Sequence, residues 1–320
     1  MEKNSRIPII IVNKGKPYYL QYVINQARLF NPDNDIILLG DKENSILSGV
    51  KHAYISDYFD NAKDFEKVYK HMSTNSYGFE LFCFQRWFCV LEYVLKNNID
   101  SFLCMDSDFL LYDSVDEIYK YIDSYDFTIC RKITPNCSFF KTTSLQVFCR
   151  FIRDLYLNQK YLAELKKLYT GLMKEGRKGG ICDMTAFGLY QKYISKNVFD
   201  LSIPFRGIAV DDCLLYSNGY EMSSSSDLMG HYSKRIYWIN NLPYGRFLET
   251  GEYIRFLGIH LQGGAKRRLL DFLLQKDKTY IKPNFMSKIL WFIKPQVFRH
   301  NLQRTFDFIK RTIKFNIRKF

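Results

Sequence analysis

Near its N-terminus the chain reads IPIIIVNKG at residues 7–15 and DIILLGD at residues 35–41. Each segment is a short, largely β-branched or aliphatic run that ends at a turn, which is typical of a strand buried on both faces of a parallel sheet. Residues 18–30 between them place apolar side chains on one helical face. This β-α-β order predicts an α/β fold, with Asn13 and Asp41 at the carboxyl edge of the sheet, where ligands bind.

A further buried strand is expected at residues 101–105, and the acidic triplet Asp106-Ser107-Asp108 follows it directly. Two carboxylates two residues apart, just beyond a strand, can turn toward one divalent cation. Mg²⁺ and Mn²⁺ take oxygen ligands and commonly share them with substrate phosphates. The triplet therefore predicts a metal site, and a solvated acidic turn is the alternative interpretation.

The late segment HLQGGAK, residues 260–266, ends a strand expected at residues 254–260. An imidazole here can join the metal, a glycine allows the backbone to approach phosphate oxygens, and a lysine can neutralise a departing diphosphate. We expect His260, Gly263 and Lys266 to serve these purposes. The same residues also fit a capped turn before a helix that begins near Lys266.

Together these features resemble the GT-A fold glycosyltransferases, in particular the glycogenin-like and bacterial galactosyltransferase-like retaining enzymes. The resemblance covers residues 7–266 and rests on the Asp-Ser-Asp and His-x-x-Gly-x-x-Lys motifs. It implies a Rossmann-like, mixed but mainly parallel sheet flanked by helices. It also implies that Asp106, Asp108 and His260 bind Mn²⁺ or Mg²⁺, while Gly263 and Lys266 contact the diphosphate of a nucleotide-sugar donor.

Further donor-binding candidates lie near the same edge of the expected sheet. Asn13, Asp41 and Ser107 follow strands, and Arg86 lies on a helix expected at residues 77–97. In GT-A enzymes a basic residue on that helix often contacts the donor; a solvent-facing arginine is the alternative. The motifs also depart from the family, because Arg267 replaces the usual proline after the lysine and residues 136–138 read NCS instead of Asn-x-Gly. These departures indicate a distant relative with its own acceptor chemistry.

Two acidic residues are candidates for a catalytic carboxylate. Asp183 follows a basic, glycine-rich loop at residues 176–180 and heads a helix expected at residues 184–195, where it would otherwise act only as a helix cap. Asp211 begins an Asp-Asp pair after a strand and also competes with Asp106 and Asp108 for the metal. Either could be the base of an inverting reaction. The family resemblance favours retention instead, so both the choice of residue and the stereochemistry stay open.

Composition and charge set the broader limits. A hydrophobic content of 47% with 25% charged residues is ordinary for a folded chain and excludes wholesale disorder. The eight cysteines form neither Cys-x-x-Cys pairs nor zinc-like clusters. We expect them to be reduced and mostly buried in a cytoplasmic protein. The sequence shows no secretory signal and no apolar stretch of ~18 residues that could span a membrane.

The C-terminal residues differ from the rest of the chain. Residues 276–320 hold ten of the thirteen net positive charges. Apolar side chains recur there at steps of three and four from Phe298 to Phe320, which predicts an amphipathic helix. We therefore expect a catalytic domain at residues 1–275 and a basic helical segment at 276–320 that binds an anionic membrane surface. A helix packed on the catalytic domain is the alternative, and no base-reading module favours nucleic acid.

The sequence thus predicts a metal-dependent, hexosyltransferase-type glycosyltransferase that is cytoplasmic and peripherally membrane-associated. It would move a sugar from a nucleotide-diphosphate donor, in our interpretation a UDP-sugar, to a saccharide or lipid-linked acceptor, as in cell-surface polysaccharide synthesis. Two alternatives remain open. A nucleotidyltransferase would use the same Asp-x-Asp chemistry, but residues 13–17 form a poor glycine-rich loop. A non-catalytic membrane-bound scaffold would show no Mn²⁺-dependent hydrolysis of nucleotide sugars.

If the C-terminal segment binds membranes, charge reversal at Lys310, Arg311 and Lys314 should release the protein from anionic vesicles. Each basic residue near an anionic surface contributes about 1 kcal/mol of binding free energy. Replacing Phe306 and Ile313 by Ser should weaken binding even at low salt, where electrostatic attraction is least screened. Vesicle sedimentation measures both effects. Equal sedimentation of the full-length protein and a form shortened to residues 1–276 would contradict the membrane role, and aggregation of the short form would favour the packed helix.

Overall fold

The computed structural model describes residues 6–226, 230 and 232–273, which are called the described residues below. They belong to a unit, Met1–Leu273, that is separate from Leu274–Phe320. The predicted basic helix at residues 276–320 and the predicted boundary after residue 275 lie outside the described residues, and both stay predictions.

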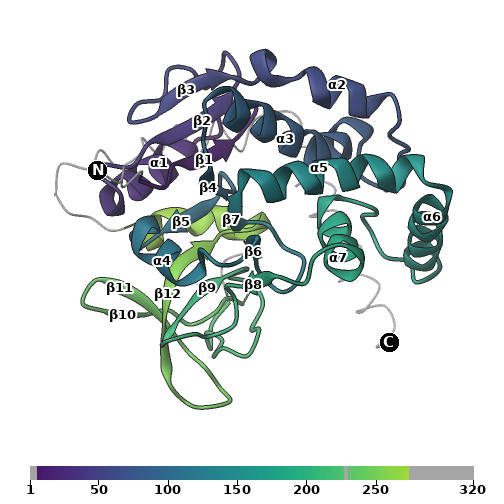
Figure 1. Ribbon diagram of the computed structural model, residues 1–320. Helices are drawn as coiled ribbons and strands as arrows, with labels where there is room; N and C mark the ends of the chain where they lie inside the picture. Colours follow the sequence, from purple (N-terminus) through teal and green to yellow (C-terminus); the bar gives the residue numbers. More distant parts are fainter. Residues whose placement is uncertain (1–5, 227–229, 231, 274–320) are drawn as a thin grey trace, which may run out of the picture. The chain divides into compact units, whose positions relative to one another are not determined.

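The larger of two sheets has seven strands in the order β3-β2-β1-β4-β7-β6-β8 (Figure 1). Strands β1 to β4 run parallel to one another, β7 runs antiparallel to β4 and β6, and β8 runs parallel to β6. The predicted mixed, mainly parallel sheet of an α/β fold is therefore confirmed. The strands are β1 (Ile9–Val12), β2 (Ile36–Gly40), β3 (Lys51–Tyr54), β4 (Ser101–Met105), β6 (Phe127–Ile129), β7 (Cys137–Lys141) and β8 (Val198–Asp200).

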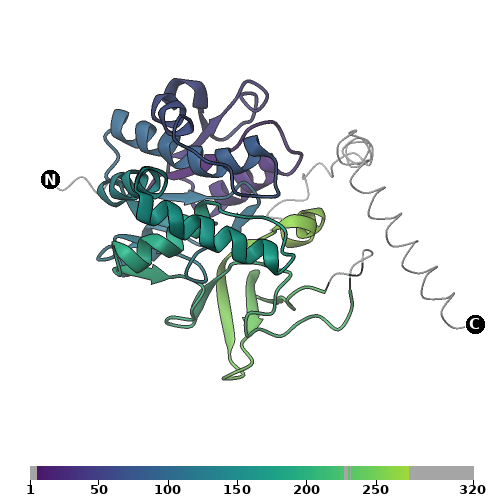
Figure 2. The ribbon, with the colours of Figure 1, turned by 90° about the vertical axis from the view of Figure 1, so that its right-hand side faces the viewer.

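Helices flank this sheet, and the main core lies between the sheet and helices α3 and α5 (Figures 1 and 2). Helix α3 is apolar on nearly all sides because it is enclosed by its neighbours. Its Trp87 lies 5.2 Å from Phe187 of α7 between ring centroids, and the Phe148 ring of α5 stacks on Phe187 at 4.0 Å. The helices are α1 (Leu20–Phe30), α2 (Asp60–Glu66), α3 (Tyr77–Lys96), α4 (Val115–Ile122), α5 (Thr142–Leu157), α6 (Gln159–Lys174) and α7 (Asp183–Tyr193), with the 3₁₀ helices η1 (Ile55–Tyr58) and η2 (Gly263–Phe272).

The smaller sheet has five strands. It brings residues 109–111 next to residues 258–260, which are distant in sequence. Strand β12 is the central strand. It pairs antiparallel with β11 and β5 and parallel with β9. The β5–β12 register places Phe109 opposite His260. A Cβ on Gly258 would lie 2.1 Å from Cζ of Phe109, so only glycine allows this close approach. The strands are β5 (Phe109–Leu111), β9 (Ile208–Asp211), β10 (Tyr237–Ile239), β11 (Leu242–Arg246) and β12 (Tyr253–His260).

Some elements differ from the sequence-based expectation. Apolar side chains at helical spacing predict one long helix over residues 145–170. The structure has two helices there, α5 and α6, because the Asn158 side chain accepts a hydrogen bond from Lys160 N–H and caps a new helix. The helix expected near Lys266 is the 3₁₀ helix η2, which begins at Gly263. The eight cysteines are free thiols, six of them buried. Within the described part of the chain, no helix combines the length and apolar character needed to cross a membrane.

Candidate metal and donor site

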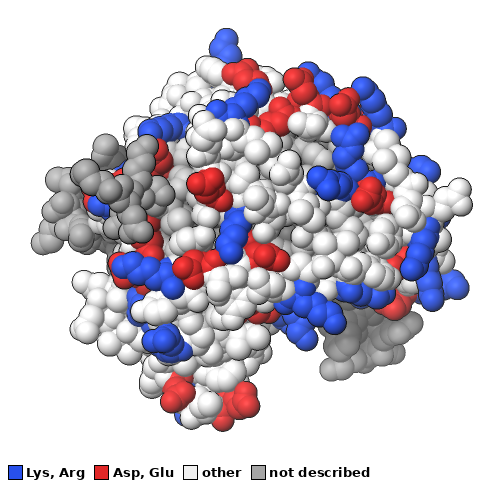
Figure 3. Space-filling view, viewed as in Figure 1, with Lys and Arg blue, Asp and Glu red and all other residues white. Residues whose placement is uncertain are grey.

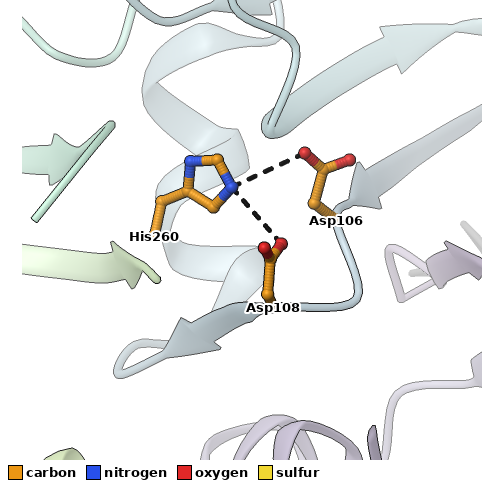
Figure 4. A group of neighbouring side chains, drawn as sticks. All are labelled: Asp106, Asp108 and His260. Carbon is orange, nitrogen blue, oxygen red and sulfur yellow. Dashed lines mark ion pairs between the residues drawn. The ribbon is translucent and has the colours of Figure 1, made fainter. Parts of the chain in front are cut away.

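Three predicted ligands meet where the two sheets join. Asp106 follows β4, Asp108 precedes β5, and His260 ends β12. Figure 4 shows the three side chains pointing toward one another, and one potential ligand atom from each lies within 4.8 Å of the others. His260 Nε2 is 3.7 Å from Asp106 Oδ2 and 3.3 Å from Asp108 Oδ1.

A hydrogen bond at the ring nitrogen that faces away from the carboxylates fixes the orientation of the His260 imidazole. His260 Nδ1 lies 2.7 Å from the backbone carbonyl of Asp212, to which it donates. With Nδ1 engaged, Nε2 is the nitrogen that faces the carboxylates, as in metal-binding histidines generally. Two carboxylates and an imidazole form a donor set that fits a divalent cation. The residues present therefore suit the metal implied by the family resemblance.

Each carboxylate also has a cationic side chain on its other oxygen. Lys266 Nζ lies 2.8 Å from Asp108 Oδ2, and Arg86 NH1 lies 2.7 Å from Asp106 Oδ1. The oxygens that remain, Oδ1 of Asp108 and Oδ2 of Asp106, are the two that face His260. The cations thus neutralise the acidic pair without covering the oxygens nearest the imidazole.

The pKa values reflect this arrangement. Burial alone would raise the pKa of Asp108, but hydrogen bonding to His260 and the charge of Lys266 lower it to about 2. Burial alone would lower the pKa of His260, but Asp108 and Asp106 outweigh it and raise that pKa to about 9. A proton on Nε2 and a cation ligated there exclude each other, so metal binding at this nitrogen is coupled to proton release.

Asp183 reaches the cluster through Arg86. Its Oδ2 accepts hydrogen bonds from Arg86 Nε at 3.2 Å, Arg86 NH2 at 2.7 Å and Trp87 Nε1 at 3.0 Å. Burial alone would lower the pKa of Arg86, but the carboxylates of Asp183 and Asp106 raise it well above its ordinary value. Arg86 is thus an ion-pairing residue between two carboxylates rather than a solvent-facing one. The catalytic role of Asp183 stays a prediction.

Asp211 is placed differently. Its side chain has no exposed surface, and its Oδ1 lies 2.5 Å from Nζ of the equally buried Lys234. Lys234 Nζ also donates to the carbonyl of Cys213 at 2.7 Å. The structure therefore shows Asp211 as half of a buried ion pair, one residue before the carbonyl that anchors His260. Its proposed catalytic role stays a prediction.

The loop after β1 brings Asn13 and Asp41 together. Gly15 N–H donates to Asp41 Oδ2 at 2.6 Å, and Asn13 Nδ2 donates to the Gly15 carbonyl at 2.8 Å. Both predicted side chains thus shape the loop at the carboxyl edge of the sheet. Their predicted contact with a donor stays a prediction.

Two other predicted donor-binding residues lie beside the metal cluster. Ser107 lies in the turn between Asp106 and Asp108, close to Tyr19, which precedes α1. Gly263 begins η2 with a φ of +59°, a left-handed conformation that glycine adopts without strain.

Three residues were missed by the sequence interpretation. The Tyr18 hydroxyl donates to the Lys266 carbonyl at 2.8 Å and so ties the start of α1 to the late motif. Lys234 forms the buried pair with Asp211, and Asn136 donates from Nδ2 to the Asp212 carbonyl at 3.2 Å. Only Asn136 carried a signal, since it stands at the family's Asn-x-Gly position; the roles of Tyr18 and Lys234 depend on contacts distant in sequence.

Comparisons with known proteins give matches among solved structures only. No family model matches the sequence, and no curated protein matches it. Mouse xyloside xylosyltransferase 1 in its apo form aligns over 62% of this chain and 85% of that chain, with a TM-score of 0.46 and 7% identity. The galactosyltransferase LgtC with donor and acceptor sugar analogues aligns over 85% and 98%, with a TM-score of 0.41 and 12% identity. The glycosyltransferase GlyE of Streptococcus pneumoniae TIGR4 aligns over 62% and 45%, with a TM-score of 0.33 and 12% identity. All three of these proteins are named as glycosyltransferases.

The buried pair beside the site leads to a stability prediction. Lys234→Met should lower the free energy of unfolding by about 3–5 kcal/mol, because it leaves the Asp211 carboxylate buried without its partner. The double variant Lys234→Met, Asp211→Leu should recover most of this loss, because it leaves no uncompensated charge. Denaturant titration followed by circular dichroism measures both.

The exposed pair of Lys120 and Glu117 provides the control for this prediction. Lys120→Met should leave the free energy of unfolding nearly unchanged, since exposed pairs contribute little. A Lys234→Met protein as stable as the Lys120→Met protein would show that the buried pair does not support the fold.

Proposed function

We propose that this chain is a metal-dependent glycosyltransferase that uses a nucleotide-diphosphate sugar, a UDP-sugar in the most specific form of the proposal. One observation carries it: Asp106 Oδ2, Asp108 Oδ1 and His260 Nε2 converge at the junction of the two sheets. The three ligands come from two motifs more than 150 residues apart in sequence. Both motifs are the ones that resemble the GT-A enzymes, which supports a donor site over a chance acidic turn.

The roles of the individual side chains follow from their contacts. Asp106, Asp108 and His260 would hold Mn²⁺ or Mg²⁺, and the bound cation would stabilise the negative charge of the departing diphosphate. Lys266 lies beside Asp108, where its ammonium group can also face phosphate oxygens. Gly263 has no side chain, so the backbone at this position can approach phosphate oxygens. Arg86 holds the Asp106 carboxylate in place through their ion pair.

The proposed acceptor position follows from the placement of Asp183 beside Arg86. Asp183 begins α7 next to Arg86, so a sugar held at the metal site would lie within the reach of this region. We propose a saccharide or lipid-linked acceptor, with the basic C-terminal segment holding the enzyme at an anionic membrane. Acidic and basic side chains are interspersed over the face drawn in Figure 3. Residues 276–320 hold ten of the thirteen net positive charges, which supports assigning membrane attraction to the C-terminal segment.

The metal assignment predicts that Asp108→Asn abolishes Mn²⁺-dependent UDP binding, because it removes a negatively charged ligand next to His260. Isothermal titration calorimetry with UDP, in the presence and absence of Mn²⁺, measures the effect. Asp113→Asn is the matched control: Asp113 lies just beyond the other end of β5 and pairs with Arg255 at 2.6 Å. Unchanged UDP affinity in Asp108→Asn, with the fold intact by circular dichroism, would contradict the metal site.

Lys266 should affect turnover and metal binding in opposite directions. Lys266→Ala should reduce kcat by ~10²-fold, the scale of losing one group that stabilises a developing negative charge. It should bind Mn²⁺ at least as tightly as the wild type, because it removes a cation that competes for Asp108. Donor-hydrolysis kinetics and Mn²⁺ titration test the two effects.

The control variant is Arg268→Ala. The Arg268 side chain pairs with Asp271 on the same 3₁₀ helix, so this variant should change neither kcat nor Mn²⁺ affinity. Normal kcat in Lys266→Ala would mean that the late motif is an ordinary turn.

A further inference from the structure

The metal ligands come from different sheets, so their spacing must be set by links between the sheets. Asp106 follows β4 of the seven-stranded sheet, whereas His260 ends β12 of the five-stranded sheet. Asp108 is tied to His260 within the smaller sheet, because Leu261 N–H donates to the Asp108 carbonyl at 3.0 Å. The covalent turn from Asp106 to Asp108 is one link between the two sheets.

Asn136 provides a second link. It directly precedes β7 in the larger sheet, and it has no exposed surface. Its backbone carbonyl accepts the Asp106 N–H at 2.9 Å, which extends the β4–β7 pairing up to the metal ligand. Its side-chain Nδ2 donates at 3.2 Å to the Asp212 carbonyl, which lies just after β9 of the smaller sheet. That same carbonyl accepts the hydrogen bond from His260 Nδ1 at 2.7 Å.

We propose that Asn136 is a positioning residue that sets the spacing between Asp106 and His260. Its main chain holds the backbone of one ligand, and its amide fixes the carbonyl that orients the other. The His260 ring is thereby held with Nε2 toward the carboxylates. The consequence for cation affinity rests on the proposed metal-dependent function, whereas the effect on the imidazole concerns the protein alone.

Strand β7 offers a matched control in Ser138. It is also fully buried, and it lies two residues from Asn136, on the same face of the strand. Its Oγ has no hydrogen-bond partner among the described residues. Ser138→Ala therefore removes a buried polar group from the same strand without removing a hydrogen bond, whereas Asn136→Ala removes the donor to the Asp212 carbonyl.

The first measurement uses the full-length, metal-free protein and needs no turnover. Solvent exchange of the His260 Nδ1 proton, followed in proton–nitrogen correlation spectra, reports its hydrogen bond to the Asp212 carbonyl. We expect the His260 Nδ1 proton to be protected from exchange in the wild type and in Ser138→Ala. In Asn136→Ala the same proton should exchange faster. Asn136→Ser keeps a short donor and should fall between them; it also serves as the test variant if Asn136→Ala does not fold.

The second measurement is a calorimetric titration of the same proteins with MnCl₂ alone. Loss of the direct partner of a metal ligand typically weakens metal binding by roughly 10- to 100-fold. The Asn136 side chain acts through the Asp212 carbonyl, so we expect Asn136→Ala to weaken binding toward the lower end of that range. Ser138→Ala should bind as the wild type does. Equal exchange and equal Mn²⁺ affinity in the alanine variants would overturn the proposal. A wild-type protein that binds no Mn²⁺ would contradict the proposed function instead, and the exchange measurement would still decide the role of Asn136.

Discussion

The guanidinium group of Arg86 holds carboxylates from two distant parts of the chain, and the remaining site residues are arranged around it. Asp106 comes from the end of β4 and Asp183 from the start of α7, while Arg86 itself belongs to α3. The Asp183 carboxylate is buried and that of Asp106 is partly exposed. Without a shared cation the two would repel one another, and Asp183 would have no compensation for its lost hydration. Aromatic side chains of the main core surround helix α3 and hold it next to the sheet, which places Arg86 between the two carboxylates.

The fold and the centre of the site were predictable because their signals are local. A strand buried on both faces is a short apolar run in the sequence, and residues 9–12, 36–40 and 101–105 are such runs. Asp106 and Asp108 lie in the turn that follows the third of these runs, and His260 ends β12. Chain position alone did not group these three side chains, because β4 and β12 belong to different sheets. The resemblance of the two motifs to the GT-A enzymes supplied that step.

The supporting residues could not be predicted because their roles arise from pairings distant in sequence. Asn136 matters only because β7 pairs with β4, and Lys234 only because a chain segment with no regular pattern returns to β9. The division between α5 and α6 was missed for a related reason. Apolar side chains continue at helical spacing past Asn158, whereas the helix ends there because the side chain of that residue caps the next one.

The placement of the ligands on two sheets has a thermodynamic consequence for the whole unit. A cation held by Asp106 from one sheet and by His260 from the other would be lost if either sheet came apart. Binding to the folded state alone stabilises a protein by about 2.7 kcal/mol when the free ligand is at 100 times its dissociation constant. The cation would thus link the two sheets, and the free energy of unfolding of the protein would rise with the free metal concentration.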